Sequence, residues 1–189
     1  MVTFRKEEPH RSDLREGRVS LPYHAYFITK CLAVPGEETL SIPACAEIVI
    51  DSIIWARDAG WWRILGFCVM PNHYHLIVGL GEIKSLSDAI AGVNKFTART
   101  INQHMKRKGS LWEEGFYDHM IRDRGDFEDI LEYTHRNPVE KGLVEIPEAW
   151  PYSTAHERYA DEIDWEWLGH LVTFPSDGSR WCEARRLQM

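Results

Sequence analysis

The chain has 189 residues, of which 22 are basic and 29 acidic, so its net charge at neutral pH is −7. Its hydrophobic fraction of 44% and charged fraction of 27% are ordinary for a globular protein, which excludes a collagen-like, coiled-coil or wholly disordered chain. A chain of this length buries enough surface to fold as one domain without disulfide bonds or a structural metal. The four cysteines show no Cys-x-x-Cys spacing, which indicates reduced thiols and excludes a zinc ribbon or a thioredoxin motif.

No apolar run reaches the roughly 18 residues that a membrane span needs. The N-terminus carries charged residues where a signal peptide would have an apolar stretch. We therefore expect a soluble, cytoplasmic protein that does not bind membranes.

The charge is distributed unevenly. Residues 94–109 contain no acidic residue and five basic ones, which are Lys95, Arg99, Lys106, Arg107 and Lys108. Residues 126–170 contain twelve acidic residues and three basic ones. Because salt screens charges beyond about 8 Å, a phosphate responds only to the local field. The net charge therefore does not exclude a nucleic-acid partner, and it predicts that any such contact is confined to one face. The five basic residues are the candidates for it, although the last three also fit an ordinary solvated helix surface.

The first half of the chain shows a strand, a helix and a hairpin. Residues 22–30 are aromatic and β-branched, which indicates a strand. Ser41 is the predicted cap of a helix with Pro43 in its first turn, and Gly60 ends that helix. Residues 62–70 and 73–80 are two apolar strands joined by a tight turn, so we expect an antiparallel hairpin.

The second half adds two helices and a strand. Ser85 and Asp88 resemble a capping box, and an apolar stripe that includes Phe96 and Met105 follows, up to residue 109. Residues 116–122 indicate a strand. Asp126 is the predicted cap of a last helix, which the pair at residues 137–138 ends.

The order of these elements matches a ferredoxin-like α+β sandwich with a central antiparallel sheet, followed by a helix that carries Tyr133. We divide the chain into an N-terminal arm at residues 1–17, the main domain at residues 18–160, and an acidic, tryptophan-rich tail at residues 161–189.

His73 and His75 flank Tyr74 at the start of the predicted strand 73–80. Residues two apart on a strand project from one face, so both imidazoles point the same way. Two such imidazoles can bind one divalent metal but leave its shell incomplete. The alternative is a pair of surface or cross-strand histidines without metal. The polar start of an otherwise apolar strand favours a site on a rigid element.

Tyr133 and Asn137 are four residues apart and share one face of the last helix. The amide oxygen of Asn137 is a suitable hard ligand beside two imidazoles. The Tyr133 phenol, with an ordinary pKa of about 10, becomes a nucleophile toward phosphorus once its phenolate is stabilised. Each residue alone also fits a structural role, as a half-buried tyrosine and as a helix-ending asparagine. The combination of all four residues favours a functional site.

Four sequence stretches together resemble the IS200-like single-strand DNA transposases, which carry a histidine pair of the HUH type and a tyrosine nucleophile. The stretches are VMPNHYHLIV, LWEEGFYDHMIRD, EYTHRNPVEKGLV and AWPYST. The resemblance is strongest to the branch called REP-associated tyrosine transposases, and it extends from about residue 18 to residue 153.

This resemblance implies an HUH fold in which His73, His75 and Asn137 bind Mg²⁺ or Mn²⁺ and Tyr133 forms a 5′-phosphotyrosine intermediate. It implies substrates that are single-stranded DNA hairpins formed by palindromic repeats. It also implies either a monomer or a homodimer that exchanges tyrosine helices. One departure is Thr134, where the branch often has isoleucine, and this affects helix packing more than chemistry.

The sequence therefore predicts an enzyme that nicks and rejoins single-stranded DNA. One alternative is a nucleic-acid-binding module that keeps the fold without cleaving. Another is a metal-dependent hydrolase of small phosphate esters, which would not need Tyr133. The presence of all four site residues favours the enzyme.

Overall fold

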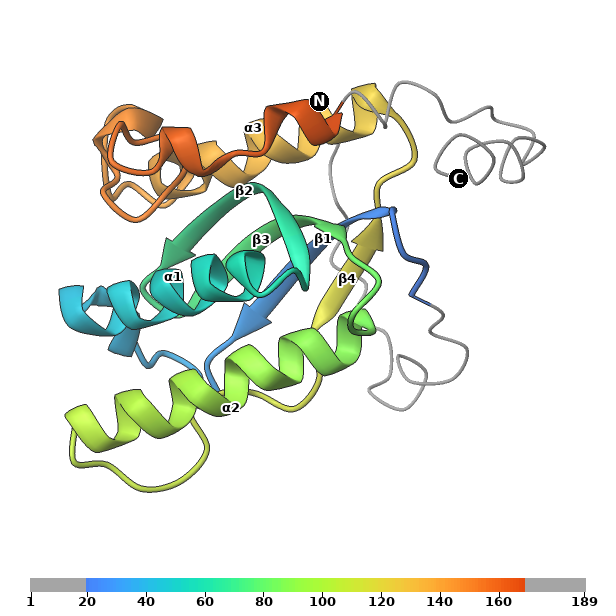
Figure 1. Cartoon of the computed structure of the whole chain (residues 1–189). Coiled ribbons are helices and arrows are strands. Elements are labelled where there is room, and N and C mark those ends of the chain that lie inside the picture. The colour runs from blue at the N-terminus through green and yellow to red at the C-terminus, as the bar shows by residue number, and fades with distance from the viewer. Residues whose placement is uncertain (1–19, 169–189) are drawn as a thin grey trace.

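The computed structural model describes residues 20–168. Four strands form one antiparallel sheet in the order β2-β3-β1-β4 (Figure 1). The strands are β1 (Ala25–Cys31), β2 (Trp62–Met70), β3 (His73–Leu80) and β4 (Tyr117–Met120). The helices are α1 (Pro43–Asp58), α2 (Leu86–His104) and α3 (Arg124–Glu140). No helix within residues 20–168 is both long and apolar enough to cross a membrane.

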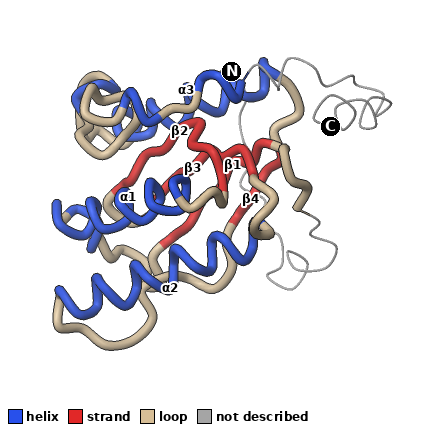
Figure 2. Tube along the Cα trace, in the orientation of Figure 1, coloured by secondary structure: helices blue, strands red, loops and turns tan. Residues whose placement is uncertain are grey.

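The order of elements confirms the predicted α+β ferredoxin-like sandwich. The chain runs β1-α1-β2-β3-α2-β4 and then continues into α3, as the tube in Figure 2 shows. Helices α1 and α2 cover one face of the sheet, and α3 lies on the other face (Figure 1). The molecule thus has three layers, and the sheet separates α3 from the other two helices.

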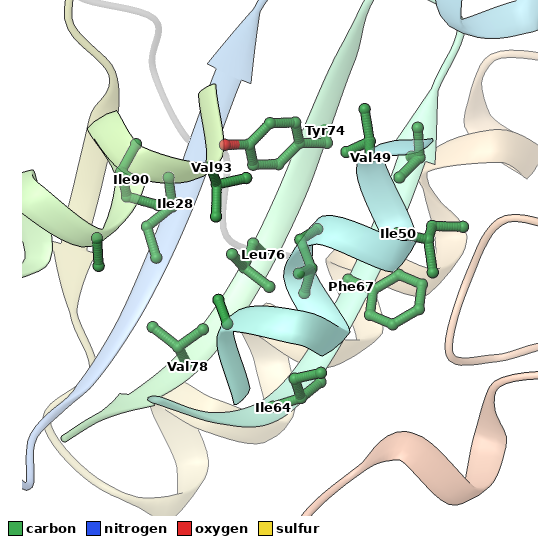
Figure 3. Packing of buried hydrophobic residues seen from close by; sticks show 14 of the residues in the cluster. Ile28, Val49, Ile50, Ile64, Phe67, Tyr74, Leu76, Val78, Ile90 and Val93 are labelled. Carbon is green, nitrogen blue, oxygen red and sulfur yellow. The ribbon is translucent and has the colours of Figure 1, made fainter. Parts of the chain in front are cut away.

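The larger part of the core lies between the sheet and the α1–α2 layer. Figure 3 shows Leu76 of β3 among side chains such as Val49 of α1 and Val93 of α2, all of them buried. Tyr74 also points to this layer, where its hydroxyl donates to the Asn94 side chain at 3.0 Å. Tyr74 therefore lies on the face of β3 opposite to that of its two histidine neighbours.

A smaller core lies under α3. Phe27 of β1 and Ile77 of β3 pack there against Phe127 and Ile130 of α3. Because β2 and β3 are buried on both faces, their sequences are apolar almost throughout rather than alternating. The histidines of β3 interrupt that pattern on the α3 face.

The start of α1 differs from the prediction. Ile42 stands at the N-cap without a side-chain hydrogen bond, and Pro43 occupies the first turn. The hydroxyl of Ser41 instead donates to the carbonyl of Glu38, within a short 3₁₀ turn. Ser41 as the helix cap was therefore wrong, because the preceding turn already uses its hydroxyl. Gly60, with a φ of 75°, follows the end of the helix as expected.

The start of α2 confirms the prediction, since the hydroxyl of Ser85 accepts a hydrogen bond from the backbone N–H of Asp88 at 3.1 Å. The apolar stripe is narrower than predicted. Phe96 and Met105 are 49% and 37% exposed, so neither belongs to the core. Phe96 lies instead on the flank of α2 that faces α1.

Helix α3 is longer than predicted at both ends. Asp123 rather than Asp126 caps it, accepting a hydrogen bond from the backbone N–H of Asp126 at 2.9 Å. The helix continues through Pro138 to Glu140, so Pro138 does not stop it. Pro138 lacks the N–H that would donate to the carbonyl of residue 134, but the backbone N–H groups of Lys141 and Leu143 still donate to the carbonyls of Asn137 and Pro138. Gly142, with a φ of 68°, follows the end of the helix.

Residues 161–168, which the sequence assigns to the acidic tail, lie against the sheet. The backbone N–H of Ile64 donates to the Asp164 carboxylate at 3.0 Å, and the Asp164 N–H donates to the Ile64 carbonyl at 2.8 Å. The Trp167 ring covers Gly79 so closely that a Cβ there would lie 2.5 Å from it. The predicted arm at residues 1–17 and the tail beyond residue 168 lie outside the described residues.

Candidate active site

The two histidines of β3 share the face of the sheet that α3 covers. In the sheet register, His75 lies opposite Thr29 of β1 and Cys68 of β2. The Nε2 atoms of His73 and His75 are 3.1 Å apart. The two imidazoles therefore converge on one point, as their spacing on a strand predicts.

A hydrogen bond at the other ring nitrogen orients each imidazole. Nδ1 of His73 donates to the side-chain oxygen of Asn72 at 2.6 Å. Nδ1 of His75 lies 3.0 Å from the hydroxyl of Thr29. Because an amide oxygen can only accept, the proton of His73 resides on Nδ1 and its Nε2 presents a lone pair. Contacts of this kind fix the rings of metal-binding histidines.

Both imidazoles are neutral at physiological pH. Burial, and to a smaller extent the charge of Lys141, lower the pKa of His73 to about 4. Burial, together with the neighbouring His73, holds the pKa of His75 well below its ordinary value. Neutral imidazole is the form that binds metals, so this environment favours coordination over protonation.

Helix α3 brings Tyr133 and Asn137 to the same place. The Asn137 amide Nδ2 donates to Nε2 of His75 at 3.1 Å. The Tyr133 ring centroid is 5.4 Å from that of His75. Asn137 is buried, whereas Tyr133 remains partly exposed. The i, i+4 spacing on α3 therefore places an amide and a phenol beside the histidine pair.

The surroundings of Tyr133 keep its phenol protonated. Burial raises the pKa of Tyr133, Glu140 raises it further, and a hydrogen bond from Asn137 opposes these effects. The Phe27 ring packs edge-on against Tyr133, with centroids 6.1 Å apart, and stacks on His75 at 5.3 Å. Phe27 thus supports both rings from the sheet. The phenol needs a cation or another donor nearby before it can act as a nucleophile.

The donor atoms fit a small divalent cation. Nitrogen atoms 3.1 Å apart match the separation of about 3.0 Å between neighbouring ligands of an octahedral ion with bonds of about 2.1 Å. Oδ1 of Asn137 is buried and has no hydrogen-bond partner among the residues that the structure describes. Such an orphaned acceptor is rare, and a cation would satisfy it. No group of three His, Cys, Asp or Glu side chains that could hold a metal forms within residues 20–168, so any third protein ligand would be of another type.

The five basic residues that the sequence assigns to DNA lie apart from this point. Lys95 and Arg99 are exposed on α2, which covers the opposite face of the sheet (Figure 1). Arg107 forms an ion pair with Glu37, and the lysines on either side of Arg107 are exposed. The structure therefore does not bring this basic segment to the histidine pair.

Two neighbours of the site were missed by the sequence reasoning. Lys141 directly follows α3 and lies near enough to His73 to lower its pKa. Had the predicted helix continued past Pro138, the eight-residue spacing from Tyr133 would have placed Lys141 on the same face. Thr29 is the other, and only the register between β1 and β3 reveals its contact with His75.

A known protein family matches the part of the chain that contains the candidate site. The family model described as "Transposase IS200 like" matches residues 45–137 of the chain. This range begins in the first turns of α1 and ends on Asn137, so it contains both histidines of β3 and Tyr133 of α3.

Two curated relatives are REP-associated tyrosine transposases. The one from Haemophilus influenzae is 32% identical over 117 residues, which cover 55% of this chain and 66% of that protein. The one from Escherichia coli is 29% identical over 140 residues, which cover 71% of this chain and 79% of that protein.

A solved structure extends the similarity to three dimensions. It is a REP-associated tyrosine transposase bound to a REP hairpin, and it superimposes with a TM-score of 0.61 at 25% sequence identity. The match covers 72% of this chain and 79% of the other chain. The chain therefore belongs to the IS200-like transposase family and is similar to its REP-associated tyrosine transposases.

Proposed function

We propose that the protein cleaves and rejoins single-stranded DNA, with Tyr133 as the nucleophile and a divalent metal held by His73, His75 and Asn137. The observation that carries this proposal is the convergence of two imidazole Nε2 atoms and the buried Asn137 amide beside a tyrosine. The amide nitrogen lies 3.1 Å from His75, and the amide oxygen has no hydrogen-bond partner among the described residues, so turning the amide over would present that oxygen to a cation. A purely structural role would leave no reason to bury that oxygen without a partner.

The residues present suit Mg²⁺ or Mn²⁺. Two neutral imidazoles and one amide oxygen would hold the ion and leave the rest of its shell for water and the substrate phosphate. A metal bound there supplies Lewis-acid stabilisation of the charge that develops on the phosphate. The Thr29 and Asn72 side chains orient the two imidazoles.

Tyr133 carries the covalent step. Its hydroxyl oxygen forms a bond to phosphorus, the bond from phosphorus to the 3′-oxygen breaks, and the phenol proton is released to solvent. The departing 3′-oxygen takes up a proton and becomes a free 3′-hydroxyl. Because the phosphotyrosine bond retains the ester, a second 3′-hydroxyl can reverse the reaction and join strands without ATP.

DNA hairpins are the proposed substrates. The similar solved structure is bound to a REP hairpin, and the curated relatives are REP-associated transposases. Lys141, beside His73 at the end of α3, provides a positive charge where the scissile phosphate would lie.

A labelled hairpin oligonucleotide incubated with the protein and Mn²⁺ tests the proposal. We expect a covalent adduct that survives a denaturing gel and is abolished by chelation or by Tyr133→Phe. Tyr23→Phe is the matched control, because Tyr23 is 54% exposed and precedes β1, outside the site. An adduct that persists in Tyr133→Phe would refute the assignment of Tyr133 as the nucleophile. Binding without cleavage under every divalent metal would instead support a non-catalytic DNA-binding module.

A further inference from the structure

A groove lies between the outer surfaces of α1 and α2, on the face of the fold opposite to the histidine pair. Its volume is about 640 Å³, and residues of both helices line it together with Trp61. Trp55 and Phe96 stand at this groove with 59% and 49% of their surface exposed. Exposed aromatic side chains gathered around one hollow are unusual on a soluble domain and mark a binding surface.

The groove presents ring faces in a fixed arrangement. The Trp61 ring lies edge to face with Trp55, with their centroids 5.1 Å apart. Trp61 also lies against Gly92 of α2, where a Cβ would come within 2.9 Å of the ring. The absence of a side chain at Gly92 thus lets the ring settle on α2. These contacts hold Trp61 in place, while Trp55 and Phe96 keep open surface.

Three basic side chains lie near these rings, outside the lining of the groove. Nζ of Lys84 lies 4.6 Å from the centroid of Trp61. Lys95 and Arg99 flank Phe96 on the exposed side of α2. None of these three cations forms an ion pair with another residue in the described range 20–168.

Negative charge at the groove is slight. Asp51 is the one acidic side chain among the lining residues of the groove, and no lysine or arginine is among them. The neighbouring carboxylates of α1 have partners of their own, since Glu47 pairs with Arg158 and Asp58 pairs with Arg57. The groove therefore combines stackable rings with basic side chains at its margin, namely Lys84 over Trp61 and the α2 residues Lys95 and Arg99.

We propose that this groove binds unpaired bases of the DNA substrate, which stack on Trp55 and Phe96 while backbone phosphates contact Lys95 and Arg99. The inference rests on the proposed function, because it takes the same DNA as ligand. Aromatic faces accept any base, and nearby lysine and arginine neutralise the backbone. A second copy of this chain would also cover the rings, and sedimentation distinguishes that occupant from DNA.

The groove would hold a part of the DNA distant from the scissile phosphate. From His73 to Leu80, the strand β3 advances seven residues, or about 23 Å at 3.3 Å each, toward the end of the sheet where Trp61 lies. That length corresponds to about seven base pairs of duplex. The groove thus suits a hairpin loop or an unpaired flank rather than the cleavage point.

Fluorescence anisotropy with a labelled hairpin, measured without metal, tests the groove independently of cleavage. The double substitution Trp55→Ala, Phe96→Ala should weaken binding of a hairpin with unpaired loop bases by roughly tenfold or more. Trp165→Ala is the matched control, since Trp165 is 57% exposed outside the groove, and it should change Kd by less than about twofold. Arg99→Gln keeps both rings and should reduce the slope of log K against log salt concentration by about 1, which corresponds to one phosphate contact.

The two proposals fail in different ways. Full-strength binding without any Mn²⁺-dependent adduct would overturn the proposed cleavage and leave the groove standing. Equal Kd values for the double substitution and Trp165→Ala would overturn the proposal that the groove binds DNA. Adduct formation would continue in that case, so the proposed cleavage would stand. Sedimentation that shows a dimer dissociated by Trp55→Ala, Phe96→Ala, with DNA binding unchanged, would assign the groove to a second copy of the chain.

Discussion

The hydroxyl of Thr29 lies 3.0 Å from Nδ1 of His75, so the strand beside β3 orients one imidazole of the candidate metal site. Substituting Thr29→Val keeps the β-branched shape and removes the hydrogen bond. We expect the affinity for Mn²⁺ to fall about 10- to 100-fold, as is common when such a partner is lost. Thr29→Ser should restore most of it. Titration calorimetry measures both variants, and a valine variant that binds Mn²⁺ normally would show that His75 needs no such support.

Asn137 should serve metal binding rather than stability. Asn137→Leu has a similar volume and removes an amide oxygen that is buried without a partner. We expect the metal-free variant to unfold within about 1 kcal/mol of the parent, because loss of the bond to His75 offsets relief of the unpartnered oxygen. Mn²⁺ at about 100 times Kd should stabilise the parent by about 2.7 kcal/mol and leave the variant unchanged. Thermal unfolding with and without Mn²⁺ compares the two, and equal stabilisation would remove Asn137 from the ligand set.

Substitutions at Trp167 and Gly79 should have coupled effects on the stability of the fold. A Cβ at residue 79 would lie 2.5 Å from the Trp167 ring, so Gly79→Ala should destabilise the fold by about 1–3 kcal/mol. In a Trp167→Ala background the ring is absent, and the same substitution should cost less than about 1 kcal/mol. Urea denaturation of the four proteins gives the coupling energy. Additive effects would mean that residues 161–168 do not hold the ring on the sheet.

The thiols should differ in reactivity. Burial raises the pKa of Cys68 to about 12, with a hydrogen bond to Ser153 opposing it, and burial also raises the pKa of Cys45. At pH 8, about one in 10⁴ Cys68 side chains is then a thiolate, the reactive form. We expect iodoacetamide to modify half-buried Cys31 in the native protein and to reach Cys45 and Cys68 only after unfolding. Peptide mass spectrometry reports each site, and rapid native labelling of Cys68 would contradict its burial.

Local patterns predicted most of the elements. The strands at residues 62–70 and 73–80 have the bounds that their apolar runs indicated, because burial on both faces demands continuous apolar sequence. The pairing of His73 with His75 and of Tyr133 with Asn137 followed from the periods of a strand and a helix. Within each element, spacing alone defines which side chains share a face.

Contacts between elements were not predictable in the same way. The bond from Thr29 to His75 depends on the register of two strands, and the distance from Lys95 to the histidines depends on which face α2 covers. Charge counts along the sequence carry no information about that face. The extension of α3 past Pro138 was missed because a proline usually marks a helix end. In the structure Pro138 lacks one backbone donor, but the hydrogen bonds that follow it continue the helix to Glu140.

Tyr133 and Asn137 lie one turn apart on α3, whereas both histidines belong to the sheet. A single rigid-body contact, between α3 and the cluster around Phe27 and Ile77, therefore assembles the site. If α3 separates from the sheet, the proposed third ligand Asn137 and the proposed nucleophile Tyr133 leave together. If the proposed function holds, metal affinity and tyrosine reactivity should therefore be lost together when α3 separates from the sheet.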